Sequence, residues 1–189
     1  VLIHITNHDP QCPPPAFAKT AGGIFADFNV HDFDMLRFLT GAKVANIHAR
    51  AGAKVCDGGE ADTTLISMEL ANGVFASVHC CRQSSRGYDQ RVEILGKKGM
   101  LFLRNHNDNA IAVAGGGGET MSNPPPDFAA RYRNSYQNQL RAFVAECQNK
   151  NTGDDNAASG ATLADAAEAI KTAEAAKQSL SAKQAITLP

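Results

Sequence analysis

The sequence contains no tryptophan, and aromatic residues make up only 6% of its 189 positions. No apolar run approaches the roughly 20 residues of a membrane-spanning helix, so we expect no membrane partner. Basic and acidic residues number 18 and 19, which leaves a net charge of −1 and no field that would attract nucleic acid. The hydrophobic fraction of 43% is still ample for a core, and the length suits one domain spanning residues 1–189.

The five cysteines show neither a CxxC pair nor a spacing typical of zinc sites. Because their number is odd, we expect free thiols in a reducing compartment, with the cytoplasm as the default location. The start of the chain lacks the basic region and the length of a signal peptide. It also lacks an initiator methionine, which fits a chain that begins partway through a longer protein. The cysteines are Cys12, Cys56, Cys80, Cys81 and Cys147.

One stretch, residues 22–39, combines a helical apolar pattern with two acids and a histidine. Asp27, His31 and Asp34 are four and three positions apart, which places them on one face of the predicted helix. A carboxylate that holds one imidazole nitrogen leaves the other free to act as a general base. We therefore treat His31 and Asp27 as candidate catalytic residues. The apolar stripe of this helix is Ile24, Phe28, Met35, Leu36 and Leu39.

Two other interpretations of these residues stay open. An acid and a histidine at this spacing also occur on solvated helix faces, or near a helix N-terminus where an acid complements the dipole. Alternatively, Asp27, His31 and Asp34 could bind a divalent metal, although three ligands within two turns of one helix converge poorly without a fourth.

Most of the remaining first two thirds of the chain is predicted to be strands. A strand over Val1–Thr6 ends in polar Asn7, His8 and Asp9, and an extended proline-rich connection follows. Later strands are joined by tight turns, such as the Asn-Gly turn at 72–73, and predict an antiparallel meander. We expect these strands at 43–53, 63–70, 74–80, 89–95, 100–103 and 109–114.

Two helices are predicted near the end of the chain. The first runs over 127–150 with Asp127 as its cap, and the second begins with a capping box, Thr162-x-x-Asp165, and runs to about Leu180. The run Gly115–Gly118 is predicted to be a flexible loop, because no helix follows it as a phosphate cradle would need. A polar loop is expected at 151–160 and a last short strand at 185–188. The fold class is thus α+β: an open, mostly antiparallel sheet with helices on one face.

In each of these two helices, apolar residues recur at helical spacing and are predicted to pack against the rest of the domain. We expect packing through Phe128, Tyr132, Tyr136, Leu140, Phe143 and Val144 in the first, and through Leu163, Ala167, Ile170, Ala173 and Leu180 in the second.

With these residues in place, the chain resembles the C-terminal domain of the Gfo/Idh/MocA oxidoreductase family, and most closely its inositol 2-dehydrogenase branch. The resemblance rests on the sequence Asn-His-Asp-Pro at 7–10, on Gly-Gly-Ile at 22–24 with the Asp-x-x-x-His-Asp-x-Asp helix, and on Gly-Tyr-Asp at 87–89 with the strand that follows. It extends through 131–136 to the closing helix and covers nearly the whole chain. The fold that it implies is the open sheet of glyceraldehyde-3-phosphate-dehydrogenase-like C-terminal domains.

The resemblance implies a dehydrogenase that moves hydride between a secondary alcohol of a polyol or sugar and NAD or NADP. His31 would then be the general base, and Asp27 would hold His31 or the substrate hydroxyls. Asp34, Tyr88, Asn7 and Asp9 match positions that contact the polyol. Arg86 departs from the tyrosine that inositol-type members often carry.

The dinucleotide fingerprint of the family's N-terminal Rossmann domain and its lysine in a Glu-Lys-Pro motif do not occur in this sequence. We therefore expect a substrate-binding and oligomerising half that is inactive alone, with no cofactor-binding residue that can be named. A second interpretation is a non-catalytic assembly module that buries its open sheet face against another copy. Candidate interface residues are Val92, Ile94, Leu101 and Leu103.

Overall fold

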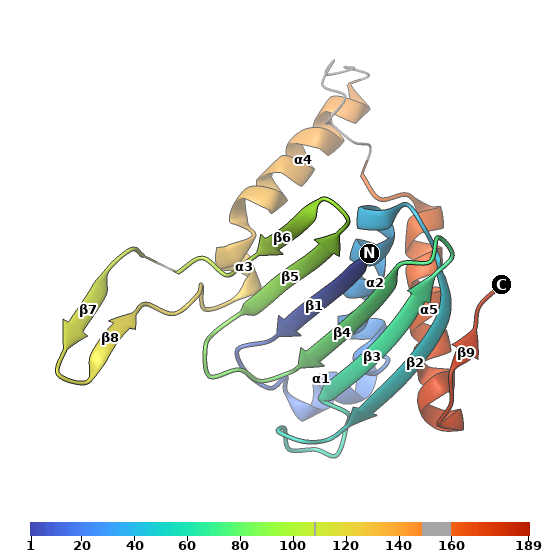
Figure 1. Ribbon diagram of the computed structural model, residues 1–189, viewed down its shortest axis with the longest axis horizontal. Coiled ribbons are helices and arrows are strands. Elements are labelled where there is room, and N and C mark those ends of the chain that lie inside the picture. The colour runs from blue at the N-terminus through green and yellow to red at the C-terminus, as the bar shows by residue number, and fades with distance from the viewer. Residues whose placement is uncertain (108, 149–159) are drawn as a thin grey trace.

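The computed structural model describes residues 1–107, 109–148 and 160–189. In this part of the chain, a seven-stranded sheet has the strand order β6-β5-β1-β4-β3-β2-β9, and helices cover one of its faces (Figure 1). Its strands are β1 (Leu2–His8), β2 (Val44–Gly52), β3 (Thr63–Leu70), β4 (Phe75–Cys81), β5 (Asp89–Gly96), β6 (Gly99–Leu103) and β9 (Ile186–Thr187).

The predicted mostly antiparallel α+β architecture is confirmed, and the strands lie close to their expected bounds. In β3, buried residues alternate with exposed ones, as the period of two requires when one face packs on helices. The turn between β3 and β4 contains Gly73 with φ of +78°, a conformation that glycine adopts without a steric penalty. The core lies between this sheet and the helices behind it.

The prediction of a simple meander was wrong at one position. Strand β1 lies between β4 and β5, parallel to β4 and antiparallel to β5. The connection 82–88 between β4 and β5 is long enough to step over the strand that separates them. The C-terminal ends of β1 and β4 therefore meet the start of β5 at one end of the sheet, and this end carries the polar residues discussed below.

The single helix predicted over 22–39 is divided into two. A π-helical turn, η1 (Phe25–Asn29), precedes the α-helix α2 (Val30–Thr40), which ends at Gly41 in the left-handed conformation. Of the expected apolar stripe, Ile24, Phe28 and Leu36 are buried, whereas Met35 and Leu39 are exposed. The wider π turn shifts the residues before it relative to those after it, so a regular helical period does not extend across both.

A short helix, α1 (Pro15–Thr20), was not predicted and lies in the segment expected to be extended. Pro15 is its first residue, a position that tolerates proline because the first amides of a helix have no intrahelical partner.

The segment 104–148 differs most from expectation. The strand predicted at 109–114 is β7 (Ala112–Gly115), which pairs only with β8 (Gly118–Met121) in a hairpin that extends away from the main sheet (Figure 1). The predicted flexible glycine loop is thus the turn of this hairpin. The helix predicted from residue 127 is formed by α3 (Phe128–Arg131) and α4 (Arg133–Cys147), and the cap at Asp127 is confirmed.

The apolar residues of α3 and α4 do not face the core, contrary to the prediction. Helix α4 projects from the body of the molecule, and its apolar side chains are 46–66% exposed. A periodic pattern shows which face is apolar but not what covers it. These residues are Tyr136, Leu140, Phe143 and Val144. The end of the predicted helix at Lys150 and most of the predicted loop at 151–160 lie outside the described residues.

The last long helix, α5 (Leu163–Ala182), packs against β2 and α2. Its predicted capping box is confirmed: the Thr162 side chain accepts from the Asp165 amide, and the Asp165 side chain accepts from the Thr162 amide. The predicted packing face was right for Ala173 and Leu180, which pack in or against the core, and wrong for Leu163 and Ile170, which are 91% and 56% exposed. The buried face consists of small residues that allow close approach: Ala169, Thr172, Ala173, Ala175, Ala176 and Ser179.

The expectation of free thiols was wrong for two cysteines. Cys12 and Cys56 form a disulfide across 44 positions of sequence, whereas Cys80, Cys81 and Cys147 are free. Pairing at this distance leaves no local sequence signal. The cytoplasmic location stays a prediction. None of the helices in the described residues is long and apolar enough to cross a membrane.

Candidate functional site at one end of the sheet

The end of the sheet at which β1, β4 and β5 meet gathers four of the six site residues predicted from the sequence. Asn7 and Asp9 end or follow β1, Tyr88 precedes β5, and Asp27 comes from η1, which packs nearby. Their convergence depends on the insertion of β1 between β4 and β5, since this insertion brings the end of one strand beside the start of the other.

Arg82, the residue after β4, lies at the centre of this group. Its guanidinium forms ion pairs with Asp27 and with Asp9, the latter with an Nη1–Oδ2 distance of 3.7 Å, and it lies 5.0 Å from the centre of the Phe28 ring. The Arg82 side chain is only 8% exposed, whereas those of Asp9 and Asp27 are about one quarter exposed. One buried cation thus fixes two carboxylates that still reach solvent, an arrangement that can present acceptor oxygens to hydroxyl groups.

The environment of Asp9 opposes its ionisation. Burial raises the pKa of Asp9, the charge of Arg82 lowers it, and the nearby charges of Asp27 and His31 act in opposite directions. Asp9 and His31 are therefore close enough to influence each other electrostatically.

A second, deeper group is centred on Asp32, whose side chain points into the core. Its carboxylate accepts hydrogen bonds from Asn7 Nδ2 at 3.3 Å, Asn29 Nδ2 at 3.2 Å and Cys80 Sγ at 3.2 Å. Burial raises the pKa of Asp32 to about 6, although these three hydrogen bonds act against the shift. Burial also raises the pKa of the Cys80 thiol, which keeps it protonated as a donor.

The deeper group is linked through Asn7 to the start of β5. Gln90 Nε2 donates to Asn7 Oδ1 at 2.9 Å and to the Tyr88 hydroxyl oxygen at 3.0 Å. Since the oxygen of Tyr88 accepts from Gln90, its own O–H proton can point toward a ligand. Burial raises the pKa of Tyr88, so the phenol stays neutral over the physiological range.

Residues from α3 form one edge of the site. Arg131 donates from Nη1 to Asn105 Oδ1 at 2.7 Å and from Nη2 to the Gln90 carbonyl at 2.9 Å. The rings of Tyr132 and Tyr88 meet edge to face with centroids 6.0 Å apart. The base of α4 is therefore fixed against the same end of the sheet.

His31 and Asp34 both lie on the α-helix α2, whereas Asp27 lies on the π-helical turn before it. His31 is exposed on the first turn of α2, and no hydrogen bond or ion pair joins it to Asp27 within the described residues. Asp34 lies 4.0 Å from Arg37 Nε, and Arg37 in turn pairs with Asp165 of α5. The structure thus brings together Asn7, Asp9, Asp27 and Tyr88, with His31 within electrostatic reach of Asp9, and leaves Asp34 beside Arg37 on α2.

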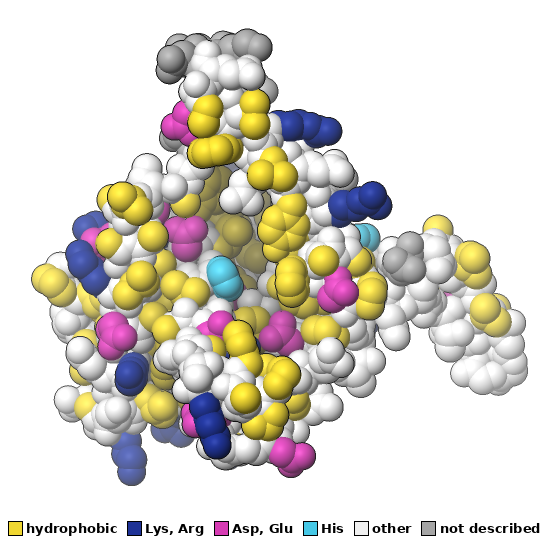
Figure 2. All heavy atoms as spheres, turned by 180° about the vertical axis from the view of Figure 1, so that it is seen from behind, with side chains coloured by type: hydrophobic (Ala, Val, Ile, Leu, Met, Phe, Trp, Pro, Cys, Tyr) yellow, Lys and Arg dark blue, Asp and Glu magenta, His cyan; other side chains and the backbone are white. Residues whose placement is uncertain are grey.

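Seen from the side covered by helices, the molecule has a hollow with acidic side chains and a histidine near its centre and hydrophobic side chains around it (Figure 2). Within the described residues, no group of three His, Cys, Asp or Glu side chains is arranged to hold a metal ion. The chemistry available here is that of hydrogen bonding to several hydroxyls together with a histidine that can accept a proton.

Comparison with known proteins identifies the family. The family model described as "Oxidoreductase family, C-terminal alpha/beta domain" of Gfo/Idh/MocA proteins matches residues 3–188. The chain belongs to the Gfo/Idh/MocA oxidoreductase family. Its relatives include the inositol 2-dehydrogenase of Rhizobium meliloti (strain 1021), which is 35% identical over 88% of this chain and 52% of that protein. The myo-inositol 2-dehydrogenase of Thermotoga maritima is 32% identical over 84% of this chain and 48% of that protein.

Solved structures support the same assignment. A scyllo-inositol dehydrogenase from Lactobacillus casei, crystallised with NAD(H) and scyllo-inositol, matches 98% of this chain and 56% of that chain, with a TM-score of 0.84 and 26% identity. A myo-inositol dehydrogenase from Corynebacterium glutamicum shares the fold, with a TM-score of 0.90 at 24% identity, over the whole of this chain and 56% of that one. The chain spans about half the length of the curated relatives described above.

The glycine run 115–118 of this domain does not form the phosphate cradle of a dinucleotide-binding turn. A dinucleotide cofactor needs a glycine-rich turn that opens into a helix, so that backbone amides can cradle the phosphates. In the part of the chain that the structure describes, the glycine run 115–118 instead closes the β7–β8 hairpin. We assign none of these residues to cofactor binding.

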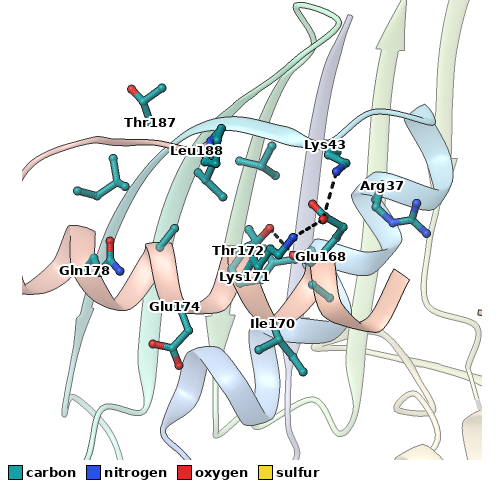
Figure 3. A pocket seen from close by; sticks show the side chains of 16 residues that line it. Arg37, Lys43, Glu168, Ile170, Lys171, Thr172, Glu174, Gln178, Thr187 and Leu188 are labelled. Carbon is teal, nitrogen blue, oxygen red and sulfur yellow. Dashed lines mark hydrogen bonds and ion pairs between the residues drawn. The ribbon is translucent and has the colours of Figure 1, made fainter. Parts of the chain in front are cut away.

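A pocket of about 400 Å³ lies elsewhere, between α5, the end of α2 and the C-terminal segment (Figure 3). None of the six predicted site residues lines it. Its two lysines, Lys43 and Lys171, both pair with Glu168, at 3.2 and 2.8 Å. This pocket offers a ligand mainly apolar walls, with both lysines sharing one carboxylate, and we do not regard it as the site of proton transfer.

Sequence reasoning missed Arg82, Asp32 and Gln90. Arg82 follows an alternating apolar strand, so the rule that drew attention to Asn7 and Asp9, polar residues at a strand end, would also have selected it. Asp32 stands within the quoted helix motif but was not distinguished from its neighbours. Gln90 belongs to an alternating strand and carries no signal of its own.

Proposed function

We propose that this chain is the polyol-binding half of an NAD(P)-dependent dehydrogenase that acts on a secondary alcohol, with an inositol-like polyol as the most fitting substrate. The observation that carries the proposal is the Arg82 pair, in which one buried guanidinium holds Asp9 and Asp27 from two different elements beside Tyr88. A cyclic polyol presents several hydroxyls in fixed directions, and such a set of acceptors and donors matches it. The whole chain acts as one domain, and NAD or NADP is held by residues outside it.

In this proposal each residue has a separate task. His31 accepts the proton of the hydroxyl that is oxidised, since a neutral imidazole is a suitable base near neutral pH. Asp9 and Asp27 accept hydrogen bonds from neighbouring hydroxyls, and Tyr88 donates one. Asn7, predicted from the sequence to contact the polyol, is buried with both ends of its amide bonded, so it positions Gln90 and Tyr88 instead of touching the polyol. Asp34 lies one turn after His31 on α2 and is retained as a further hydroxyl contact on that basis.

The proposal includes self-association through the uncovered face of the sheet. This face carries exposed apolar side chains, among them Leu65 at 59% and Phe75 at 57% exposure, which a second copy could cover. Of the interface residues expected from the sequence, Leu101 and Leu103 are exposed, whereas Val92 and Ile94 are partly buried against the core. Sedimentation tests this part: a monomer at micromolar concentration contradicts it, and association lost in Phe75→Glu supports it.

Calorimetric titration of the chain with myo-inositol tests polyol binding. Asp9→Asn should weaken binding about tenfold or more, because a hydrogen bond to a charged acceptor contributes about 1.5–3 kcal/mol. Tyr88→Phe should weaken it by a smaller factor. Glu119→Gln, a carboxylate-to-amide change on the distant hairpin, serves as the control and should bind as the parent does. A parent chain that binds neither myo-inositol nor scyllo-inositol would overturn the proposal.

The role of His31 needs a chain that can transfer hydride. Joining this chain to the cofactor-binding half of the Rhizobium meliloti relative supplies one, and inositol-dependent reduction of NAD is the readout. His31→Ala should lower kcat by about 10²–10⁴, the range for general acid–base catalysis. Unchanged turnover would show that His31 is not the base. Asp27→Asn should lower kcat at least about tenfold while the melting temperature changes by only a few degrees.

A further inference from the structure

The Cys12–Cys56 disulfide joins the two loops that flank the candidate polyol site. Cys12 lies three residues after Asp9, in the segment between β1 and α1, and Cys56 lies in the loop between β2 and β3. The two segments also meet at a second point, since a Cβ placed on Gly58 would lie 3.6 Å from Pro15 Cβ. Cys12 Sγ itself is 3.6 Å from the side chain of Gln83, the neighbour of Arg82.

The loop that carries Cys56 is itself firmly anchored. The Asp62 carboxylate accepts hydrogen bonds from the backbone amides of Lys54, Val55 and Cys56, at 2.8–2.9 Å. Asp62 is 1% exposed, and the hydrogen bonds hold the pKa of its carboxyl below its ordinary value, despite the opposing effect of burial. The loop therefore offers a rigid attachment point for Cys12.

The anchor continues directly into the site. The Arg82 amide donates to the Asp62 carbonyl at 2.8 Å, and the Asp9 amide donates to the Cys81 carbonyl at 2.9 Å. The side chains of Arg82 and Asp9 then meet in the ion pair described above. The disulfide thus closes a ring of contacts that runs from Cys12 through Asp9, Arg82 and Asp62 to Cys56.

From this geometry we propose that the disulfide positions Asp9 and Arg82 for polyol binding, and that its reduction weakens the binding. The inference rests on the proposed function and adds redox control of the same site. On reduction, a dithiol donates two electrons and two protons: the S–S bond breaks, Cys12 and Cys56 become thiols, and the reductant forms its own disulfide. The connection 9–14, which carries Asp9, then loses its covalent tie, so binding a polyol must also order this connection.

The test compares myo-inositol binding by the unaltered chain before and after treatment with dithiothreitol, so that no substitution is needed to open the bond. Oxidised chain should bind at least about fivefold more tightly than reduced chain. Cys12→Ser should bind like the reduced chain under both conditions. Cys147→Ser, which removes an exposed free thiol of α4, is the matched control and should keep the full redox response.

Amide hydrogen exchange provides a local readout that a general loss of fold would not reproduce. Reduction should speed exchange at the amides of Asp9 and Arg82, while amides in the centre of β3 keep their protection. Equal affinity and equal exchange in both redox states would overturn the inference and leave polyol binding intact. A chain that binds no polyol in either state contradicts the proposed function as well, so the two failures are distinguishable.

Discussion

Replacing Arg82 with glutamine removes the cation that holds Asp9 and Asp27 together. Removing one partner of a buried ion pair costs about 3–5 kcal/mol when the remaining charge stays out of water. The two carboxylates here are about one quarter exposed and would regain part of their hydration, so we expect a smaller loss of about 2 kcal/mol. For a chain of this length, that loss lowers the melting temperature by about 4–8 °C.

Thermal and urea unfolding of Arg82→Gln measure this effect, with Arg86→Gln as the matched control. Arg86 is exposed, and its replacement should change stability by no more than about 0.5 kcal/mol. A double-mutant cycle with Asp27→Asn isolates the pair itself and should give a coupling energy of about 1–2 kcal/mol. If Arg82→Gln is as stable as Arg86→Gln, or if the coupling is close to zero, the arginine does not organise this end of the sheet.

Three further predictions concern single positions. The pKa of Asp32 in the folded chain is about 6 and lies above its unfolded value of 3.8, so the stability of the parent falls as the pH rises between these values. Because Asp32→Asn lacks this carboxyl, its free energy of unfolding should gain about 3 kcal/mol relative to the parent between pH 4 and pH 7. Asp34→Asn is the control for the same substitution at another aspartate. The pKa of Asp62 is lowered instead, so Asp62→Asn should cost about 1–3 kcal/mol at pH 7, a loss that disappears as acid protonates the parent's carboxylate. Gly41→Ala forces alanine into φ of +65° and should cost about 1 kcal/mol in denaturant unfolding, whereas Gly115→Ala, with open space around it and no positive φ, should be close to neutral. A stability difference between the parent and either aspartate variant that stays constant with pH, or equal losses at the two glycines, would contradict the corresponding argument.

Local features of the fold were predictable because local chemistry decides them. The alternation in β3, the Asn-Gly turn before β4 and the capping box of α5 each depend on residues close together in sequence, and all three are present. The place of β1 between β4 and β5 was not predictable in this way. It depends on pairing between strands about 70 and 90 positions apart, for which the hydrophobic pattern supplies no register.

The sequence predicted which residues form the candidate site better than it predicted which of them are in contact. Residue types and spacing selected Asp27 and His31, but the expected contact between them assumed a regular helix across residues 22–39. The π turn at 25–29 separates the two residues, and Asp27 pairs with Arg82, which follows β4 and lies 55 positions away. The Cys12–Cys56 bond was missed for the same reason, since it joins loops that only the folded sheet brings together.

The central claim, that this end of the sheet binds a polyol, is tested most directly by mapping myo-inositol on the chain with backbone amide chemical shifts. We expect the largest changes at Asp9, Arg82 and Tyr88, with lesser changes on the first turn of α2 beside His31. The pocket between α5 and the C-terminal segment supplies the competing location (Figure 3). Saturable changes confined to Glu168 and Thr172 in that pocket, with none at Asp9 or Tyr88, would contradict the account.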